Sequence, residues 1–497
     1  MRMKKVVAIM AACTMLAASF VGCAKDNSKD GAGTVTNAPT TTDNNTSGDA
    51  SNDEIVTLRW VTVGGGMPSN YDAWQKSINA YLGEKIGVNV DVEVVSWGDW
   101  DNRRNIIINS GESFDILFTD GIKYNTAAKL GAFLDITELA KTASPELYSY
   151  IPEDYWNAVK VDGKIYSVPT YKDSSATNYF VYDTEKAAKY NVNFKGINSL
   201  SDLTDGLKAM KDGEGTNPFL LAVEGSGVVT MNYDNMGAGF RPLGVRFDDE
   251  SRKVVNIFEQ EDVLKELDTL HQWYKEGIIN ADAPTLAEAP SYRMVYTAQG
   301  WSGAAKTTWG PNMGVEASAD QYGDTIVSND TVRGSLNAIS ASSKYPEKAL
   351  QLLQLVNLDT KVRDAFYYGL EGENFNYTAD GKIERINNDW NMAGYTQGTF
   401  FTVSQLSDAE FNQWDEVKEL NSNAKPSVLL GFTFDTTNVE TELASCNVVF
   451  DKYKSFLLTG AQDPRDLVKQ MGEELKAAGF DKLLAEAQAQ VDAAFAN

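Results

Sequence analysis

The chain has 497 residues and a net charge of −25, from 44 basic and 69 acidic side chains. A chain of this length exceeds a single hydrophobic core, so we expect two lobes or more. Its acidic surface repels nucleic acid and anionic lipid, which excludes nucleic acid as a partner.

The N-terminus predicts export. Three basic residues precede an apolar run over 6–21, which has signal-peptide length and is too short to span a bilayer. Gly22 and Cys23 follow, and the arrangement resembles a bacterial lipoprotein signal, with Phe20 where leucine is usual. This resemblance implies a signal peptide over 1–22 and lipidation of Cys23, which would anchor the protein to the outer face of the cell membrane. The alternative is an ordinary secretory signal with an incidental cysteine.

The next segment, 23–54, predicts a disordered tether. It is rich in Asn, Thr, Asp, Ser and Gly and cannot bury enough apolar surface to fold. A flexible coil of this length has an end-to-end distance of about 30 Å. That reach suits a globular body held off a membrane. The alternative, a tail without consequence, predicts no lipid on Cys23.

From residue 55 onward, strand-like and helix-like patterns alternate. "VNVDVEVVSWG" alternates like a strand, and "YDAWQKSINAYLGEKIG" has helical spacing and ends at a glycine. Such alternation is typical of an α/β fold with a mostly parallel sheet. Strands are expected at 54–64, 88–98 and 114–121, and helices at 71–87, 99–112 and 125–133.

Cysteine and histidine are scarce. With Cys13 in the signal and Cys23 lipidated, Cys446 is the remaining thiol, so neither an intrachain disulfide nor a cysteine metal site is expected. His271 lies in "VLKELDTLHQWYKEG", which reads as an amphipathic helix. We expect a structural or surface role for it, and this discounts a Ser-His-Asp triad.

In open α/β sheets, ligands bind beyond the carboxyl ends of the strands. Four of the five stretches expected there contain Trp or Tyr, which suits a ligand with apolar faces. The five stretches are "GGGMPSN", "SWGDW", "FTDGIKYN", "VPTYKD" and "GWSGAAKTTWG".

Several segments in order carry a resemblance to a known family. "IINSGESFDILFTDG", "GAFLDITEL", "VDGKIYSVPTYKD" and "ASSKYPEKALQLLQLV" are similar to motifs of the bacterial extracellular solute-binding proteins, family 1, of ABC importers. "YGLEGENFNY", "SVLLGFTFDTTNVETEL" and the C-terminal tail resemble a lipoprotein subfamily with a C-terminal domain of unknown function. The resemblance covers nearly all of the chain from residue 55.

The resemblance implies a two-lobed periplasmic-binding-protein-like fold of type II, with a mostly parallel sheet in each lobe and a ligand cleft at the hinge. It implies capture of an oligosaccharide by a monomer and delivery to ABC permease subunits, with no cofactor, metal or catalytic residue. The implied organisation is lobe 1 over 55–172, lobe 2 over 173–328, a return to lobe 1 over 329–385, and a C-terminal helical region, 386–497, packing mainly on lobe 2.

The chemistry of a sugar ligand indicates which residue types should line the cleft. A sugar ring presents a C–H face that packs on flat aromatic rings, and hydroxyls that pair with carboxylates and amides. Several candidates have a structural alternative, such as Trp301 plugging its lobe, Asp120 capping the next helix, or Tyr171 packing the hinge. The predicted ligand-binding residues are Trp97, Asp120, Tyr124, Tyr171, Lys172, Trp301, Trp309, Tyr368 and Trp390.

Two other functions stay open from the sequence. A binding protein for a peptide or another non-sugar solute would show fewer exposed aromatics and more paired charges in its cleft. A secreted glycoside hydrolase would need two carboxylates about 5–9.5 Å apart across one cleft. With 69 acids in the chain, such pairs arise by chance.

Overall fold

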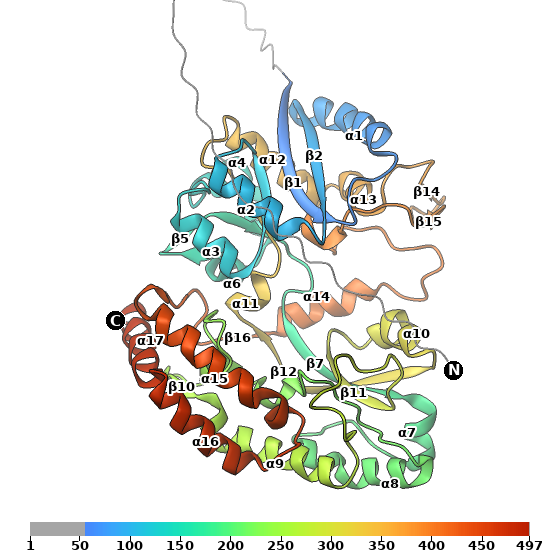
Figure 1. The fold of residues 1–497 in the computed structure, drawn as a ribbon. Helices are drawn as coiled ribbons and strands as arrows, with labels where there is room; N and C mark the ends of the chain where they lie inside the picture. The colour runs from blue at the N-terminus through green and yellow to red at the C-terminus, as the bar shows by residue number, and fades with distance from the viewer. Residues whose placement is uncertain (1–54, 497) are drawn as a thin grey trace, which may run out of the picture. The chain divides into compact units, whose positions relative to one another are not determined.

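The structure is a computed structural model that describes residues 55–496. Two large hydrophobic cores organise these residues. Figure 1 shows the strands and helices that surround them. One core gathers residues between Leu58 and Tyr171 with residues between Val327 and Met392, and we call this part lobe 1. The other gathers residues between Phe180 and Tyr322 with the C-terminal helices, and we call it lobe 2. The predicted signal peptide, Cys23 and tether lie outside the described residues.

Lobe 1 is built on a five-stranded sheet of order β2-β1-β3-β13-β6. Four strands run in the same direction, because β13 is antiparallel to both of its neighbours while β1, β2 and β3 are mutually parallel. The mostly parallel sheet predicted for lobe 1 is therefore confirmed. The strands are β1 (Val56–Gly64), β2 (Val88–Ser96), β3 (Ile116–Thr119), β6 (Ser167–Pro169) and β13 (Leu336–Ile339).

The three helices expected in lobe 1 form, two of them close to the predicted positions and the third, α3, four residues earlier than predicted. The helix after β1 ends where Gly87 adopts a left-handed conformation with φ of 65°, which glycine reaches without steric cost. The lobe 1 helices are α1 (Tyr71–Ile86), α2 (Trp100–Ser110), α3 (Gly121–Lys129), α4 (Leu139–Ala143), α5 (Pro145–Tyr150), α6 (Glu153–Ala158), α12 (Pro346–Leu358) and α13 (Thr360–Tyr368).

The main sheet of lobe 2 has the order β11-β7-β12-β16. The prediction of a mostly parallel sheet is wrong for this lobe, because β7 is antiparallel to both β11 and β12. The reason is the chain path: β7 carries the chain away from lobe 1, and β12 carries it back. The strands are β7 (Ala176–Asp183), β11 (Val295–Gln299), β12 (Ala317–Val327) and β16 (Lys425–Pro426), and the main helices are α7 (Thr184–Tyr190), α8 (Thr204–Glu214) and α9 (Glu261–Lys275).

Three chain segments connect the two lobes side by side. At Ile326, β12 pairs with Ala176 of β7 on one side and with Lys425 of β16 on the other. The return to lobe 1 passes through α11 (Asn329–Val332), and the last crossing follows α14 (Gln413–Asn423). In Figure 1, α14 lies between the sheets of the two lobes. Three neighbouring connections are a geometry suited to a hinge.

The C-terminal helices α15 (Glu440–Leu458), α16 (Pro464–Ala477) and α17 (Phe480–Ala494) contribute buried residues to the core of lobe 2. The predicted boundary at residue 386 is too early, because Met392 is buried in the core of lobe 1 and Tyr395 packs against it. We therefore place the start of the region that packs on lobe 2 near residue 428. Within residues 55–496, no helix is both long and apolar enough to span a membrane.

Candidate functional site

The carboxyl edge of the lobe 1 sheet gathers the loops that follow its strands. Strands β1, β2, β3 and β6 end there, and β13 begins there opposite Thr119 and Pro169. Trp97 directly follows β2, Asp120 directly follows β3, and Lys172 is the third residue after β6. These three predicted residues therefore belong to one edge of one sheet.

An aromatic platform lies at this edge. The ring of Trp97 stacks on that of Tyr395, with centroids 6.2 Å apart and planes inclined by 11°. Phe118 meets the same tyrosine edge-on at 6.1 Å and supports it from the core side. Trp97 is 55% exposed although it is held by a ring partner, so it offers a flat apolar face to solvent.

Two cations border the platform. The Lys172 ammonium lies 5.7 Å from the Tyr395 ring centroid and pairs with Asp173 at 2.7 Å. Arg104, which is nearly inaccessible, donates to Asp120 at 2.8 Å and lies over the Trp100 ring. Asp120 stays partly exposed, so its carboxylate has lone pairs available for a ligand hydroxyl.

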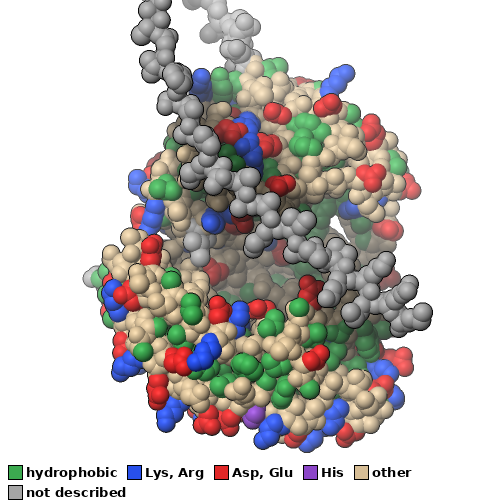
Figure 2. Space-filling view, in the orientation of Figure 1, with side chains coloured by type: hydrophobic (Ala, Val, Ile, Leu, Met, Phe, Trp, Pro, Cys, Tyr) green, Lys and Arg blue, Asp and Glu red, His purple; other side chains and the backbone are tan. Residues whose placement is uncertain are grey.

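The edge also has a defined electrostatic character. Burial raises the pKa of Tyr395, and the nearby Asp120 charge raises it further, so the phenol is neutral at physiological pH. Asp120 occupies the N-cap position of α3, as its structural alternative has it, but its side chain makes no capping hydrogen bond there. Figure 2 shows acidic and basic side chains interspersed over the visible face, with no extended basic patch.

Trp301 lies in lobe 2, where it follows β11 and contacts α14. Its ring centroid is 5.8 Å from that of Trp414, which in turn stacks on Phe400 at 4.2 Å. Glu416 accepts hydrogen bonds from the backbone N–H groups of Ser302 (2.7 Å) and Gly303 (3.0 Å). Trp301 is thus half-buried in a cluster that joins lobe 2 to α14 and Phe400, outside the core of lobe 2, so it does not plug that lobe from the inside.

Three predicted ligand residues are buried, and these predictions are wrong. Tyr124 is inaccessible, donates to Val159 O at 2.6 Å, and has a pKa raised to about 12, with burial as its largest cause. Tyr171 packs edge-on against Phe401 in the core of lobe 1. Tyr368 donates to Ser404 O at 2.7 Å. In each case the apolar ring packs inside, where its burial is most favourable.

Two predicted tryptophans are half-buried and pack against neighbouring aromatic rings. Trp390 donates from Nε1 to Phe366 O at 2.9 Å, and its ring lies 5.3 Å from that of Trp74 in lobe 1. Trp309 packs on Tyr179, with centroids 6.0 Å apart, in a small cluster of lobe 2. Neither contributes to the platform.

Sequence reasoning missed Tyr395 and Arg104. Tyr395 ends the stretch "NNDWNMAGY", in which Trp390 was the predicted residue, and Tyr395 rather than Trp390 lies at the platform. Arg104 lies one helical turn into α2, beyond the strand ends on which the prediction depended. Its burial distinguishes it from the neighbouring Arg103, and burial is a structural property that the sequence does not give.

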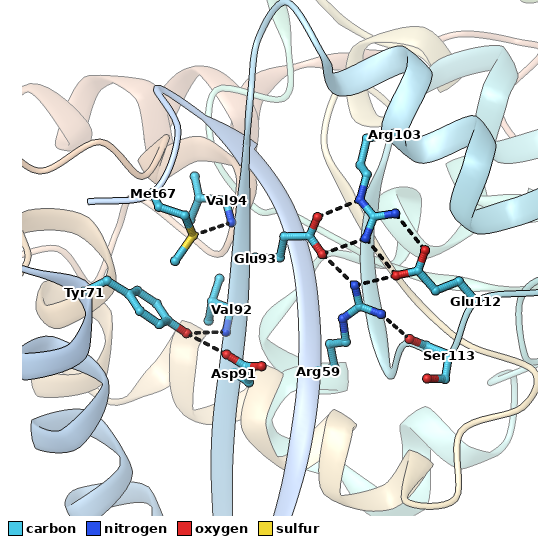
Figure 3. A network of polar contacts seen from close by, with 10 residues as sticks. All are labelled: Arg59, Met67, Tyr71, Asp91, Val92, Glu93, Val94, Arg103, Glu112 and Ser113. Atoms are coloured by element: carbon cyan, nitrogen blue, oxygen red, sulfur yellow. Dashed lines mark hydrogen bonds and ion pairs between the residues drawn. The ribbon is translucent and has the colours of Figure 1, made fainter. Parts of the chain in front are cut away.

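A separate polar network crosses β1, β2 and α2 (Figure 3). Arg59 and Arg103 each bind both Glu93 and Glu112, at 2.6–2.7 Å. These hydrogen bonds lower the pKa of Glu112 to about 2, with Arg103 as the largest cause, and lower that of Glu93. A glycosidase acid requires a raised pKa, so this pair of carboxylates is a structural feature.

The side chains that could bind a metal ion or act as a nucleophile are few in residues 55–496. No group of three His, Cys, Asp or Glu side chains among residues 55–496 could hold a metal ion. His271 contacts Gly460 O through Nδ1 at 2.8 Å, as expected for a structural histidine. Burial raises the pKa of the Cys446 thiol to about 11, which makes it a poor nucleophile.

Two lobes joined by three crossing segments, with an aromatic platform where strands end, define a ligand-binding protein of the type II periplasmic-binding class. Residues 76–370 match the model of the bacterial extracellular solute-binding proteins, and the chain belongs to that family. Residues 428–496 match a domain of unknown function (DUF3502). Both results confirm the family resemblance.

The chain is also similar to individual proteins. A carbohydrate ABC transporter substrate-binding protein of Streptococcus pneumoniae serotype 4 is 27% identical over 453 residues, covering 86% of this chain and 89% of the relative. The crystal structure of the N-glycan transport solute-binding protein (NgtS) from S. pneumoniae is 26% identical, with a TM-score of 0.78, over 88% of this chain and 98% of that one. The same protein in complex with Man5GlcNAc is similar with a TM-score of 0.63, 26% identity and the same two coverages.

Proposed function

We propose that this chain is the substrate-binding component of an ABC importer and that it captures an oligosaccharide between its lobes. The observation that carries the proposal is the exposed Trp97 ring stacked on Tyr395, beside the Arg104–Asp120 pair and Lys172. The C–H face of a sugar ring packs on such a platform, and its hydroxyls find charged hydrogen-bond partners at the rim. Support also comes from the relatives, which are named as carbohydrate or N-glycan transport proteins.

The proposed mechanism is a population shift without bond chemistry. A ligand that contacts both lobes binds the closed arrangement more tightly than the open one and so increases its population. The three adjacent crossings supply the hinge. The closed monomer then delivers its ligand to the permease subunits, and no catalytic group takes part.

The experiment that tests this function is calorimetric titration of residues 23–497 carrying Cys23→Ser. The ligands are Man5GlcNAc, shorter mannose–N-acetylglucosamine sugars, and unrelated glucose and galactose oligosaccharides, with short peptides as controls. Saturable heat from one oligosaccharide class, with none from peptides, is expected. Heat from peptides only would favour the peptide-binding alternative, and release of reducing ends on incubation would favour the hydrolase.

We also propose that lipidated Cys23 anchors the protein to the outer face of the membrane. The signal-like sequence before it and the polar stretch after it support this proposal. Metabolic labelling with a fatty-acid probe tests it, and Cys23→Ala is expected to abolish the label and release the protein into the medium. Label that persists in Cys23→Ala would exclude this anchor.

A further inference from the structure

The turn that carries Tyr395 is held by an unusual buried cation. Arg363 of α13 is fully buried, and its guanidinium donates to Thr399 O at 2.6 Å, Gly394 O at 2.7 Å and Gly398 O at 3.2 Å. In the described part of the chain, all three of its hydrogen bonds go to backbone carbonyls and none to a carboxylate. Burying a charge without a direct ion pair is costly, and besides the three carbonyls the charge of the neighbouring Asp364 offsets part of this cost.

The three acceptors have a specific relation to Tyr395. Gly394 precedes it directly, while Gly398 and Thr399 follow it, so one guanidinium joins the two ends of the turn. The planar fork of arginine presents donors in several directions at once, which a lysine ammonium on a flexible stem does not reproduce. Burial lowers the pKa of Arg363 to about 10, so the group remains charged at neutral pH.

Other contacts in lobe 1 fix the middle of the same turn. Ser335 donates to Tyr395 O at 2.8 Å, and Asn337 donates to Thr396 O at 3.0 Å. Gly394 lies against the Tyr367 ring so closely that an added Cβ would approach it within 2.4 Å. Both ends and the middle of the turn are therefore constrained, and its first half is the short 3-10 helix Gly394–Thr396.

We infer that Arg363 is a positioning residue for ligand binding, which holds the turn 394–399 so that Tyr395 supports the exposed face of Trp97. The inference rests on the proposed function and deepens it by assigning a residue that touches no ligand. A preorganised turn lowers the ordering cost of binding, whereas a loosened turn restores that cost. Loss of the fork should therefore weaken binding through Tyr395 alone.

The test is a double-mutant cycle on the Cys23→Ser chain with Man5GlcNAc as the probe. Arg363→Lys is expected to weaken binding about tenfold in the presence of Tyr395, and less than twofold in the Tyr395→Ala background. Val90→Ala, at a buried position in β2, serves as the control, because it lowers stability in the same lobe without touching the turn. Equal weakening by Arg363→Lys in both backgrounds would overturn the inference while leaving the proposed function intact.

A second measurement needs no ligand. Amide hydrogen–deuterium exchange in Arg363→Lys is expected to rise at least tenfold in peptides covering 391–400 and to stay unchanged in peptides of β2. Unchanged exchange in 391–400, or a rise across the whole of lobe 1, would contradict a positioning role. If the wild-type chain binds no oligosaccharide, the proposed function fails, and this exchange result still decides whether Arg363 holds the turn.

Discussion

The hydroxyl oxygens of Thr177 and Thr325 lie 2.8 Å apart, buried where β7 and β12 cross between the lobes. One hydroxyl donates to the other, and this hydrogen bond ties the outgoing strand to the returning one. A hinge that moves as a unit needs its strands to stay paired while the lobes rotate. The pair is therefore a suitable place to test how the crossing is stabilised.

We expect Thr177→Val to reduce the free energy of unfolding by about 1–2 kcal/mol, because it leaves the Thr325 hydroxyl buried with little compensation. The double variant Thr177→Val/Thr325→Val should be more stable than this single variant, since both polar groups are then removed. Urea unfolding measures both, with the exposed Thr307→Val as control. A double variant whose loss equals the sum of the single losses would show that the two hydroxyls act independently.

Trp97 offers the most direct test of the platform. Trp97→Ala should weaken oligosaccharide binding by about 1–3 kcal/mol, as for a stacking anchor, and change the free energy of unfolding by less than about 1 kcal/mol because the ring is 55% exposed. The matched control is Tyr124→Phe, which removes a buried hydrogen bond to Val159 O and should cost about 1 kcal/mol of stability with unchanged affinity. Calorimetry and urea unfolding separate the two effects. Unchanged affinity in Trp97→Ala together with weakened affinity in Tyr124→Phe would mean that the ligand does not bind at the platform.

The sequence was most informative about the positions of strands and helices and about the residues that directly follow each strand. Strands and helices alternate where the pattern indicates, and residues just after strands share one edge, so Trp97, Asp120 and Lys172 were predictable. The direction of the strands in lobe 2 was not predictable, because side chains alternate with a period of two residues in parallel and antiparallel strands alike. Only the path of β7 out and β12 back decides it.

The errors at the site have a common physical cause. Tyr171 is buried in the core of lobe 1, while the next residue, Lys172, reaches the Tyr395 ring. The sequence places both at the strand end but does not say which one points inward. Likewise Trp390 and Tyr395 lie in one segment, and contact with Trp74 determines that Trp390 packs inside. These choices depend on neighbours that are distant in the chain.

The contact of α14 with the Trp301 turn gives a third prediction. Glu416 accepts from two consecutive backbone N–H groups, so Glu416→Ala leaves both without their carboxylate partner. We expect it to lower the free energy of unfolding by about 2 kcal/mol. Glu419→Ala on the same helix, at an exposed position, is the control and should change stability by less than about 0.5 kcal/mol. Equal losses of stability in the two variants would mean that the Glu416 carboxylate does not stabilise the turn.

The network of Figure 3 predicts a loss of stability in acid. The pKa of Glu112 is lowered to about 2 in the folded state, chiefly by Arg103, whereas an unperturbed glutamate titrates near pH 4.5. A lowered pKa means that the contribution is complete above the unfolded value and is lost as pH falls through the folded one, here between about pH 4.5 and pH 2. Because these side chains are about 30% exposed, solvent screening reduces the contribution to about 1 kcal/mol.

Urea unfolding at pH 7, 4 and 3 measures this loss. The free energy of unfolding should decline less with falling pH in Glu112→Gln than in the wild type. The control Glu138→Gln, which changes a carboxyl group 80% exposed, should follow the wild type. Parallel declines in all three proteins would mean that the arginines stabilise the charged and neutral forms of Glu112 equally.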